Sequence, residues 1–264
     1  KDELMNEAHA TAGVMRQLFE KKFLVTYEKE VGRLNRGGEP HLDNIKTLSE
    51  AQQEAYNQIL FQFLKKKVVL LRGVTSSGKT EIYIHLIKQA LERHEQVLYL
   101  LPEIALTVQI RQRLQRVFGD RLGIYHSKYS DAERVEIWKK QLSLTPYDVI
   151  LGARSAVLLP FNNLGLVIID EEHETSFKQQ DPAPRYHARS VAIMLAQQFG
   201  AKTLLGSATP SAESWNNAET GKYGLVELDQ RFKGIELPEI KVVDVKDMQR
   251  RKMMYGPISP LLLE

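Results

Sequence analysis

The sequence predicts an α/β fold in which a mostly parallel sheet is flanked by helices. Three observations predict it. From residue 47 onward, short apolar segments alternate with segments of helical periodicity, which is the order of elements in parallel sheets. A glycine-rich, phosphate-binding pattern stands between the first apolar segment and the helix after it. Nearly every apolar segment is followed by polar residues, at the sheet edge where open α/β folds bind ligands.

Six segments are predicted as strands because each is short and apolar. They are residues 68–71, 97–101, 122–125, 149–151, 166–169 and 203–205. Continuous apolar runs of this kind are typical of strands covered on both faces. Two helices are predicted from apolar stripes of helical periodicity, of which the second is less regular than the first. The stripes are Ile82, Leu86, Ile87, Ala90 and Leu91 in the first, and Val108, Ile110, Leu114 and Val117 in the second.

The two ends of the chain break this alternation. Residues 7–20 have helical periodicity, and residues 23–27 and 31–34 are predicted as two short strands. This order is compatible with the C-terminal part of a winged-helix-like module. An irregular extension packed on the main domain explains it equally well, so both interpretations stay open. Near the other end, residues 242–245 are a further candidate strand.

The composition excludes several classes of protein. With 43% hydrophobic and 26% charged residues among 264, it is that of an ordinary globular protein. No segment approaches the ~20 apolar residues of a membrane span and none resembles a secretory signal, so a cytoplasmic protein without membrane contact is expected. The absence of cysteine excludes disulfides and thiolate metal sites, and a net charge of +3 leaves the partner open. Because the chain lacks an initiating Met and ends in an apolar stretch, we expect a fragment of a longer protein.

Residues 73–80 predict a nucleoside triphosphate site. They are Gly73, Val74, Thr75, Ser76, Ser77, Gly78, Lys79 and Thr80, which fit the pattern G-x-x-x-x-G-K-[ST]. The glycines allow backbone N–H groups to curl around phosphates, and the following helix points its N-terminal dipole at the anion. Lys79 is placed to reach the β- and γ-phosphates, and the Thr80 hydroxyl to bind Mg²⁺.

Two acidic residues after the strand at 166–169 predict the catalytic groups. Asp170 ends an apolar strand beside the P-loop strand, where it can hold Mg²⁺. Glu171 is placed to orient and deprotonate the water that attacks the γ-phosphate. His173 is interpreted as a coupling residue beside these carboxylates.

The ends of the other predicted strands carry further polar residues. They include Pro102, Glu103 and Thr107 after the second strand, His126 and Ser127 after the third, Gly152, Arg154 and Ser155 after the fourth, and Gly206, Ser207 and Thr209 after the sixth. Because the carboxyl ends of parallel strands meet at one edge of the sheet, these segments together predict a site there.

Two side chains have alternative interpretations. Ser49 and Gln52 have the spacing of a capping box at a helix start. Gln52 also precedes the P-loop strand, where it could contact adenine, although spacing alone favours the cap. Tyr186, which follows Arg185 in a loop, is either a base-stacking side chain or an aromatic that anchors the loop.

The motifs stand in the order found in superfamily 2 helicases, which the chain resembles over residues 45–245. The residues that carry the resemblance are 48–52, 73–80, 101–107, 152–156, 170–173 and 206–210. Residues 102–104, 176–180 and 185–189 look more specifically like the PriA family of replication-restart helicases. The resemblance implies a RecA-like P-loop NTPase lobe of an ATP-dependent 3′→5′ DNA helicase that acts at stalled forks.

The resemblance also implies how the chain is divided. Residues 1–36 would be a winged-helix-like remnant, 37–46 a linker, 47–224 the ATP-binding lobe 1, and 225–264 an extension toward a second lobe. The implied cofactors are ATP and Mg²⁺. Zn²⁺ is expected in the full-length family, but its cysteine ligands are absent from this chain.

Roles of individual residues follow from the resemblance. Gln52 would contact adenine, the catalytic residues would be Lys79, Asp170 and Glu171, and the coupling residues would be His173, Ser207 and Thr209. The residues implied on the DNA path are Pro102, Glu103, Thr107, Arg154, Ser155, Lys178, Arg185 and Tyr186. The implied partners are single-stranded and forked DNA, single-strand-binding protein and other primosome proteins. A monomer associated with the nucleoid in a bacterial cytoplasm is expected.

The chain departs from the family in two ways. The family often carries a tryptophan before the Arg-Tyr-His run, where this chain has Pro182, Ala183 and Pro184, so base stacking would depend on Phe177 and Tyr186. The family's second lobe, which supplies an arginine finger, is absent from the sequence. Because phosphoryl transfer needs charge neutralisation from both sides, we expect the isolated chain to bind ATP weakly and to hydrolyse it barely.

Two other functions compete with this one. The first is another superfamily 2 translocase, such as a RecG-like or restriction-type motor, against which residues 178–189 argue. The second is a non-catalytic nucleotide-binding module that serves protein contacts. The presence of Lys79, Thr80, Asp170 and Glu171 argues against such a module.

Overall fold

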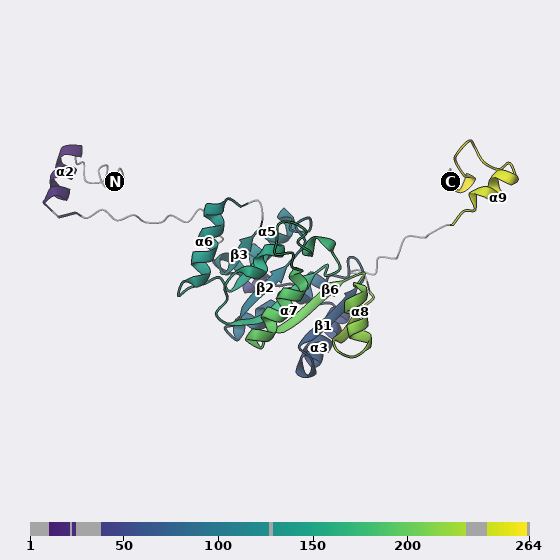
Figure 1. The fold of residues 1–264 in the computed structure, drawn as a ribbon, viewed down its shortest axis with the longest axis horizontal. Helices are drawn as coiled ribbons and strands as arrows, with labels where there is room; N and C mark the ends of the chain where they lie inside the picture. Colours follow the sequence, from purple (N-terminus) through teal and green to yellow (C-terminus); the bar gives the residue numbers. More distant parts are fainter. Residues whose placement is uncertain (1–10, 22, 25–37, 127–128, 231–241, 263–264) are drawn as a thin grey trace.

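The computed structural model describes residues 11–21, 23–24, 38–126, 129–230 and 242–262. Within them, seven parallel strands form one sheet in the order β3-β4-β2-β5-β6-β1-β7 (Figure 1). The strands are β1 (Val68–Gly73), β2 (Gln96–Leu100), β3 (Leu122–Tyr125), β4 (Val149–Gly152), β5 (Leu164–Asp170), β6 (Lys202–Ser207) and β7 (Gly224–Leu228). The parallel α/β fold and the six predicted strands are confirmed.

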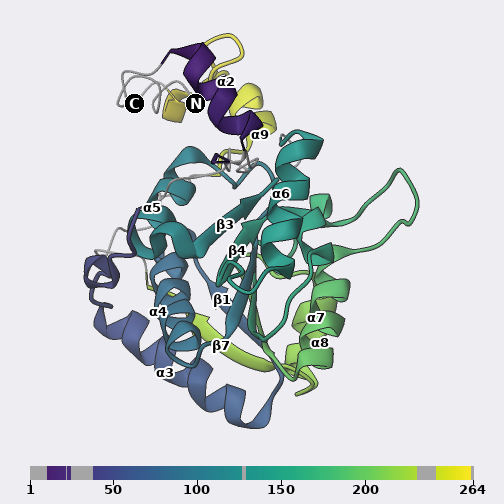
Figure 2. The ribbon, with the colours of Figure 1, turned by 90° about the vertical axis from the view of Figure 1, so that its left-hand side faces the viewer.

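Helices cover both faces of the sheet (Figure 2). One face carries α3 (Glu50–Lys65), α4 (Lys79–Glu92) and α5 (Val108–Phe118), and the other carries α6 (Asp131–Leu142), α7 (Ala188–Phe199) and α8 (Ala212–Glu219). Short 3₁₀ helices are η1 (Leu42–Asn44), η2 (Gly119–Arg121), η3 (Arg154–Leu158), η4 (Thr175–Phe177) and η6 (Pro260–Leu262), and the remaining α-helices are α2 (Ala12–Glu20) and α9 (Val245–Arg250). Both predicted helices are confirmed, and the first stripe is buried, whereas Val108 of the second stripe is 54% exposed. In the described ranges, no helix has the length and apolar character needed to cross a bilayer.

Each central strand divides its side chains between two apolar cores. Val69 and Leu71 belong to the core beneath α3, α4 and α5, whereas Val68 and Leu70 belong to the core beneath α6, α7 and α8. Successive side chains of a strand point to opposite faces, so a strand covered on both sides must be apolar at every position. The helical crossovers between consecutive strands make the strands parallel, so their carboxyl ends lie at one edge of the sheet.

Two predictions about the sheet are wrong. β7 was not expected, because its residues alternate between buried and more exposed positions and Glu227 is exposed. It pairs with β1 at the edge of the sheet, where one polar side chain is tolerated. β5 was expected beside the P-loop strand, but β6 lies between β5 and β1. The polar residues after β6 therefore stand between the P-loop and Asp170.

The candidate strand at 242–245 is also wrong. Val245 begins α9, and the Asp244 side chain accepts hydrogen bonds from the backbone N–H groups of Lys246 and Asp247. Val242 is 91% exposed. A β-branched run without a partner strand has nothing to pair with, so the local cap decides the structure.

The described N-terminal residues support part of the prediction there. α2 falls inside the predicted helical segment 7–20. The predicted strands at 23–27 and 31–34 lie outside the described residues, except for Phe23 and Leu24, so the choice between a winged-helix remnant and an irregular extension stays a prediction. From residue 38 the chain lies along the end of α5, where Gly38 O accepts a hydrogen bond from Asp120 N at 2.9 Å.

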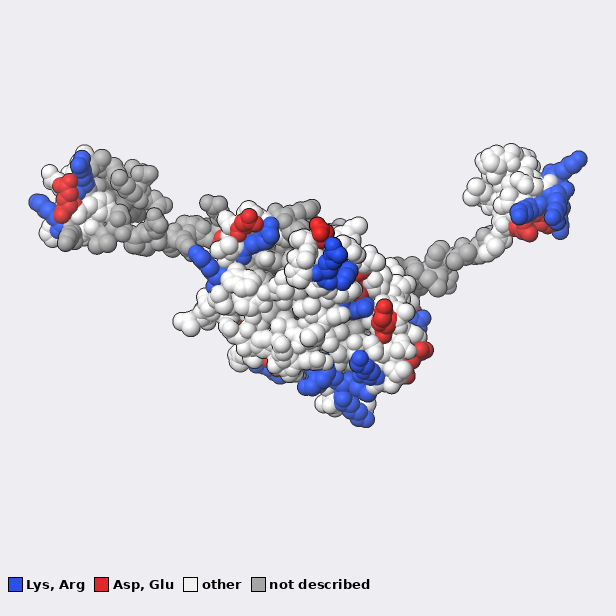
Figure 3. Space-filling model, in the orientation of Figure 1, with Lys and Arg blue, Asp and Glu red and all other residues white. Residues whose placement is uncertain are grey.

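Lysines at the amino ends of the strands hold carbonyl groups at helix ends. In Figure 3, Lys and Arg side chains gather at the lower end of the molecule, below α3 and α8. Lys66 Nζ donates to Gly221 O after α8, and Lys202 Nζ donates to Phe63 O in the last turn of α3. Positive charge is favourable at helix C-termini. These lysines thus stabilise the end of the sheet that lies opposite the polar motifs.

Candidate active site

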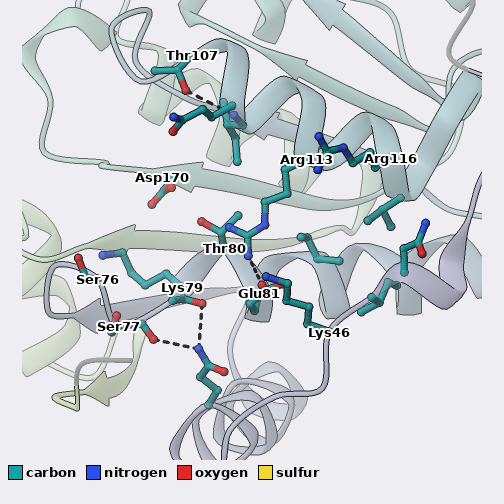
Figure 4. A pocket seen from close by; sticks show the side chains of 18 of the residues that line it. Lys46, Ser76, Ser77, Lys79, Thr80, Glu81, Thr107, Arg113, Arg116 and Asp170 are labelled. Carbon is teal, nitrogen blue, oxygen red and sulfur yellow. Dashed lines mark hydrogen bonds and ion pairs between the residues drawn. The ribbon is translucent and has the colours of Figure 1, made fainter. Parts of the chain in front are cut away.

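A cavity of about 970 Å³ opens at the carboxyl ends of β1 and β5 (Figure 4). The P-loop and the start of α4 line one side of it, α5 lines the facing side, and Asp170 lies at one end. Glu171 also lines the cavity. The described residues that line it include four cationic side chains, those of Lys46, Lys79, Arg113 and Arg116. Arg113 pairs with Glu81 across the cavity. A cavity lined in this way suits a polyanionic ligand.

The P-loop turn occupies the predicted position between β1 and α4. Ser76 and Gly78 have left-handed backbone angles, φ 63° and 81°, and α4 begins at Lys79. The first N–H groups of α4 have no partners inside the helix, and they lie at the cavity. Lys79 Nζ donates to Gly73 O at 2.9 Å, so the amine is folded back over the loop.

One feature of this loop fits a bound phosphate. Ser77 is 2% exposed, and its Oγ is one of the few buried side-chain atoms without a hydrogen-bond partner in the described part of the chain. An unpaired buried hydroxyl is costly unless a ligand pairs with it. A Cβ added at Gly73 would lie 3.0 Å from the Lys79 side chain and from Ser77 Oγ. Glycine at position 73 therefore allows Lys79 and Ser77 to lie close to the loop backbone.

Gln52 links the start of α3 to the P-loop. The predicted capping box is confirmed, since Ser49 N donates to Gln52 Oε1 at 2.9 Å and Gln52 N donates to Ser49 Oγ at 3.4 Å. The amide Nε2 of Gln52 donates to Ser77 O at 3.0 Å. The side chain is 2% exposed. Gln52 thus stabilises the P-loop by a hydrogen bond to its backbone and also lines the cavity.

Asp170 is buried at the end of β5. Tyr83 Oη donates to its Oδ1 at 3.0 Å, and Tyr99 Oη donates to its Oδ2 at 3.3 Å. Burial raises the pKa of the Asp170 carboxyl from 3.8 to about 6, and the adjacent Glu171 carboxylate raises it too, while Lys79 lowers it. A divalent cation at this carboxylate would favour the ionised form.

Glu171 is held differently from its neighbour. Its backbone is in the left-handed region at φ 48°, which costs a non-glycine residue about 1–3 kcal/mol and persists only where the surrounding structure holds it. Its Oε1 lies 3.9 Å from Lys79 Nζ, and its side chain is 35% exposed. The buried Asp170 carboxylate is therefore suited to bind a cation. The partly exposed Glu171 carboxylate is suited to contact a water molecule.

The three predicted coupling residues lie together. Ser207 Oγ is 2.8 Å from His173 Nδ1 and accepts a hydrogen bond from Thr209 N at 3.0 Å. His173 Nδ1 is also 3.7 Å from Glu171 Oε2. Contacts thus run from Glu171 through His173 and Ser207 to the segment after β6.

A buried ion pair that the sequence did not predict stabilises the carboxyl edge of the sheet. Glu172 is fully buried and pairs with Arg189 Nη1 at 2.5 Å. It also accepts hydrogen bonds from Ser211 N at 2.7 Å and Ser214 Oγ at 2.8 Å. The first turns of α7 and α8 are thereby tied to the residue after Glu171.

The residues predicted on the DNA path after β2 have different surroundings. Pro102 is buried, and its carbonyl accepts a hydrogen bond from Ala105 N at 2.9 Å, so it shapes a turn. Thr107 caps the first turn of α5. Glu103 is exposed, and Ile104, which was not selected from the sequence, is 86% exposed.

Residues 178–187 form a hairpin that projects from the body of the protein (Figure 2). A bridge between Lys178 and His187 closes it, and Lys178 Nζ donates to Arg185 O at 2.6 Å. Arg154 Nη1 donates to Lys178 O at 3.0 Å. The Arg154 guanidinium therefore braces the base of the hairpin, and half-buried Ser155 follows it in η3.

The aromatic residues near this hairpin are largely committed to the core. Phe177 is fully buried, so the expectation that it stacks on a base is wrong. Tyr186 is half-buried and packs against the core beneath α7, which supports the interpretation that it anchors the loop. The Arg185 side chain is exposed.

Comparison with protein families and curated proteins gives consistent matches. A family model described as DEAD/DEAH box helicase matches residues 49–217. The chain is 38% identical over 256 residues to replication restart protein PriA of Bacillus subtilis (strain 168), covering 94% of this chain and 31% of that protein. It is 45% identical over 217 residues to replication restart protein PriA of Rickettsia conorii, covering 82% and 32%. The chain thus spans about a third of the length of the curated relatives it matches.

Solved structures resemble the chain more distantly. The DUF1998 helicase MrfA bound to DNA and AMPPNP matches with a TM-score of 0.49 at 20% identity, over 72% of this chain and 28% of that one. The helicase domain of Pyrococcus furiosus Hef matches with a TM-score of 0.46 at 15% identity, over 68% and 39%.

Proposed function

The chain belongs to the DEAD/DEAH box helicase family, and on that premise we propose that it is the ATP-binding lobe of a 3′→5′ DNA helicase for replication restart. The observation that carries the proposal is a single cavity lined by Lys79, Thr80, Asp170 and Glu171. These side chains supply a phosphate-binding amine, a hydroxyl and a carboxylate for a cation, and a base. Phosphoryl transfer requires all of these groups.

The residues of the cavity fit ATP with Mg²⁺. Lys79, the Ser77 hydroxyl and the first N–H groups of α4 would bind phosphate oxygens. Thr80 and Asp170 would hold Mg²⁺, which neutralises phosphate charge when bound. Glu171, with its partly exposed carboxylate, would accept the proton of the attacking water.

Gln52 would bind adenine through the acceptor capacity that it has left. Its Oε1 accepts a hydrogen bond from Ser49 N, and an amide oxygen has two lone pairs. The second lone pair can accept a hydrogen bond from an exocyclic amine. Its donor group holds the P-loop carbonyls, so base contact and loop position would be linked.

ATP hydrolysis would change the position of Glu171, and a chain of contacts would transmit that change to the rest of the lobe. The chain runs from Glu171 through His173 to Ser207 and Thr209. The segments after β5 and β6 are also tied by Glu172 N, which donates to Gly206 O at 3.1 Å. A change in the position of Glu171 thus has a short route to Thr209.

We further propose that the isolated chain binds ATP weakly and hydrolyses it slowly. Of the cations that line the cavity, Arg113 is paired with Glu81, and Lys79 lies on the P-loop side. A second lobe in the complete protein would bring positive charge to the other side of the transferred phosphoryl group.

The names of the relatives support the proposed substrates and partners. Proteins named for replication restart match this chain, so we propose single-stranded and forked DNA as substrates. Single-strand-binding protein and other primosome proteins would be partners, and the protein would act as a monomer in the bacterial cytoplasm. Exposed Arg185 and Glu103 would lie nearest the strand, with Lys178 and Tyr186 shaping the hairpin.

The test is Lys79→Ala in the complete protein. Hydrolysis and fork unwinding are expected to fall about 10²–10³-fold, as for loss of a group that stabilises developing charge, while DNA binding stays within twofold. The matched control is Lys88→Ala, which replaces an exposed lysine on the same helix. It should change neither ATP hydrolysis nor fork unwinding. Unwinding that survives Lys79→Ala would contradict the proposal.

A further inference from the structure

Two buried tyrosines that are not among the residues lining the cavity donate hydrogen bonds to the Asp170 carboxylate. Tyr83 and Tyr99 are each 0% exposed. Their rings meet edge to face with centroids 5.6 Å apart. The two hydroxyls donate to different oxygens of the same carboxylate, at 3.0 Å to Oδ1 and 3.3 Å to Oδ2. The proposed function assigns no role to either tyrosine.

The two tyrosines come from separate elements that surround β5. Tyr83 lies on α4, one helical turn after Lys79, so it occupies the same side of that helix. Tyr99 lies on β2 and pairs with Ile168 of β5. A buried tyrosine hydroxyl needs a partner, and here both hydroxyls meet at one carboxylate. The P-loop helix and the strand beside β5 thus share a contact at Asp170.

Gly206 leaves room for the Tyr83 hydroxyl. A Cβ added at Gly206 would lie 1.8 Å from Tyr83 Oη and 3.3 Å from Asp170 Oδ1. Only glycine allows this close approach of β6 to the hydroxyl. Tyr83 therefore touches Asp170 and the residue before Ser207 at the same time.

The hydrogen bonds leave the two carboxylate oxygens unequal. Oδ1 accepts from Tyr83 Oη and also from Glu171 N at 3.1 Å, whereas Oδ2 accepts from Tyr99 Oη. A carboxylate oxygen has about two acceptor sites. Oδ1 is therefore saturated, and Oδ2 keeps one site for another partner.

We propose that Tyr83 and Tyr99 are positioning residues that hold the Asp170 carboxylate so that Oδ2 faces a divalent cation bound with the nucleotide. The inference rests on the proposed nucleotide site. Tyr83 fixes the rotation of the carboxylate by saturating Oδ1. Tyr99 shares Oδ2 with the cation, so its contribution to cation affinity is smaller. Tyrosines that served only to fill the core would affect stability and leave the cation requirement unchanged.

The experiment separates nucleotide affinity from the magnesium requirement in the complete protein. Binding of a fluorescent ADP analogue is measured in EDTA and then during titration with MgCl₂. Tyr83→Phe is expected to raise the half-maximal Mg²⁺ concentration about tenfold, the lower end of what losing an outer hydrogen bond costs a metal site. Tyr99→Phe is expected to raise it less than threefold. Affinity in EDTA should stay within twofold for both variants. Tyr147→Phe is the control, since its hydroxyl does not contact Asp170.

A second variant keeps the test decisive if Tyr83→Phe fails to fold. Gly206→Ala displaces the Tyr83 hydroxyl without changing the tyrosine, and it should raise the Mg²⁺ requirement to a similar degree. An unchanged Mg²⁺ requirement in Tyr83→Phe or in Gly206→Ala would overturn the inference, as would an equal loss of affinity in EDTA. Failure of the unaltered protein to bind the nucleotide would instead contradict the proposed nucleotide site.

Discussion

Arg189→Met should destabilise the chain strongly, because it leaves a fully buried carboxylate without its charge partner. Glu172 is 0% exposed, and the Arg189 side chain is 13% exposed. Removing one member of a buried ion pair costs about 3–5 kcal/mol. Glu172 would keep hydrogen bonds from Ser211 and Ser214, which places the expected loss of unfolding free energy near the lower value, about 3 kcal/mol.

The double variant separates the charge from the packing. Glu172→Gln combined with Arg189→Met removes both charges and keeps similar volumes. Replacing a buried ion pair by neutral groups is often close to neutral, so the expected loss is about 1 kcal/mol. The double variant should therefore be about 2 kcal/mol more stable than Arg189→Met alone, because it no longer leaves an unpaired buried charge.

Urea denaturation at neutral pH measures these differences, and thermal melting checks them. A loss of about 3 kcal/mol corresponds to a drop in Tm of about 6–12 °C for a chain of this size. Lys88→Met removes an exposed pair with Glu92 and should cost less than about 1 kcal/mol. An Arg189→Met loss below 1 kcal/mol, or a double variant as unstable as the single one, would refute the reasoning.

Three further predictions concern the site and its supports. Glu171→Gln in the complete protein should lower the rate of ATP hydrolysis about 10²–10⁴-fold, as for loss of a general base, with nucleotide affinity within threefold; a rate within tenfold of the unaltered protein would contradict the assignment. Asp170→Asn should gain about 3 kcal/mol of stability relative to the unaltered metal-free chain between pH 4 and pH 7.5, because the pKa of Asp170 is raised from 3.8 to about 6 and the ionised carboxylate is disfavoured in the folded state. The acceptor that Asn takes away from one tyrosine hydroxyl lowers the stability of the variant equally at both pH values. The gain should disappear as the pH falls through 6 toward 4, where the carboxyl is protonated in the folded state; a stability difference independent of pH in melting curves would contradict it. Gly119→Ala should destabilise the chain by at least about 1 kcal/mol, since Gly119 has φ 51° and an added Cβ would lie 2.3 Å from Gly38 O. An unchanged midpoint of unfolding in urea would contradict this prediction and show that the segment at Gly38 moves away from the new methyl group.

Local patterns in the sequence were sufficient for most of the fold. The six apolar strands and the capping box at Ser49 and Gln52 were predicted because they depend on residues close together in the chain. β7 was missed because an edge strand needs less apolar surface, and one exposed glutamate broke its pattern. The place of β6 between β5 and β1 was beyond prediction, since strand order depends on how helices cross the sheet.

The residues of the candidate site also fall into two groups, those that the sequence predicted and those that it did not. Lys79, Thr80, Asp170 and Glu171 were selected from the sequence because their spacing after apolar strands carries the chemistry, and the cavity brings them together. Phe177 was selected as a stacking residue and proved to be buried. A short aromatic segment does not reveal which side chain points into the core, because that depends on the elements that cover it.

The sequence by itself determined that the chain forms a parallel α/β sheet with a phosphate-binding loop and an acidic pair at its carboxyl edge. Both depend on the order of neighbouring residues along the chain. Only the tertiary structure decided which groups hold Asp170, because Tyr83 and Tyr99 lie 87 and 71 residues away from it. It also decided that Glu172 is a buried anchor for Arg189, since a charged residue in a polar motif is expected at the surface until packing encloses it.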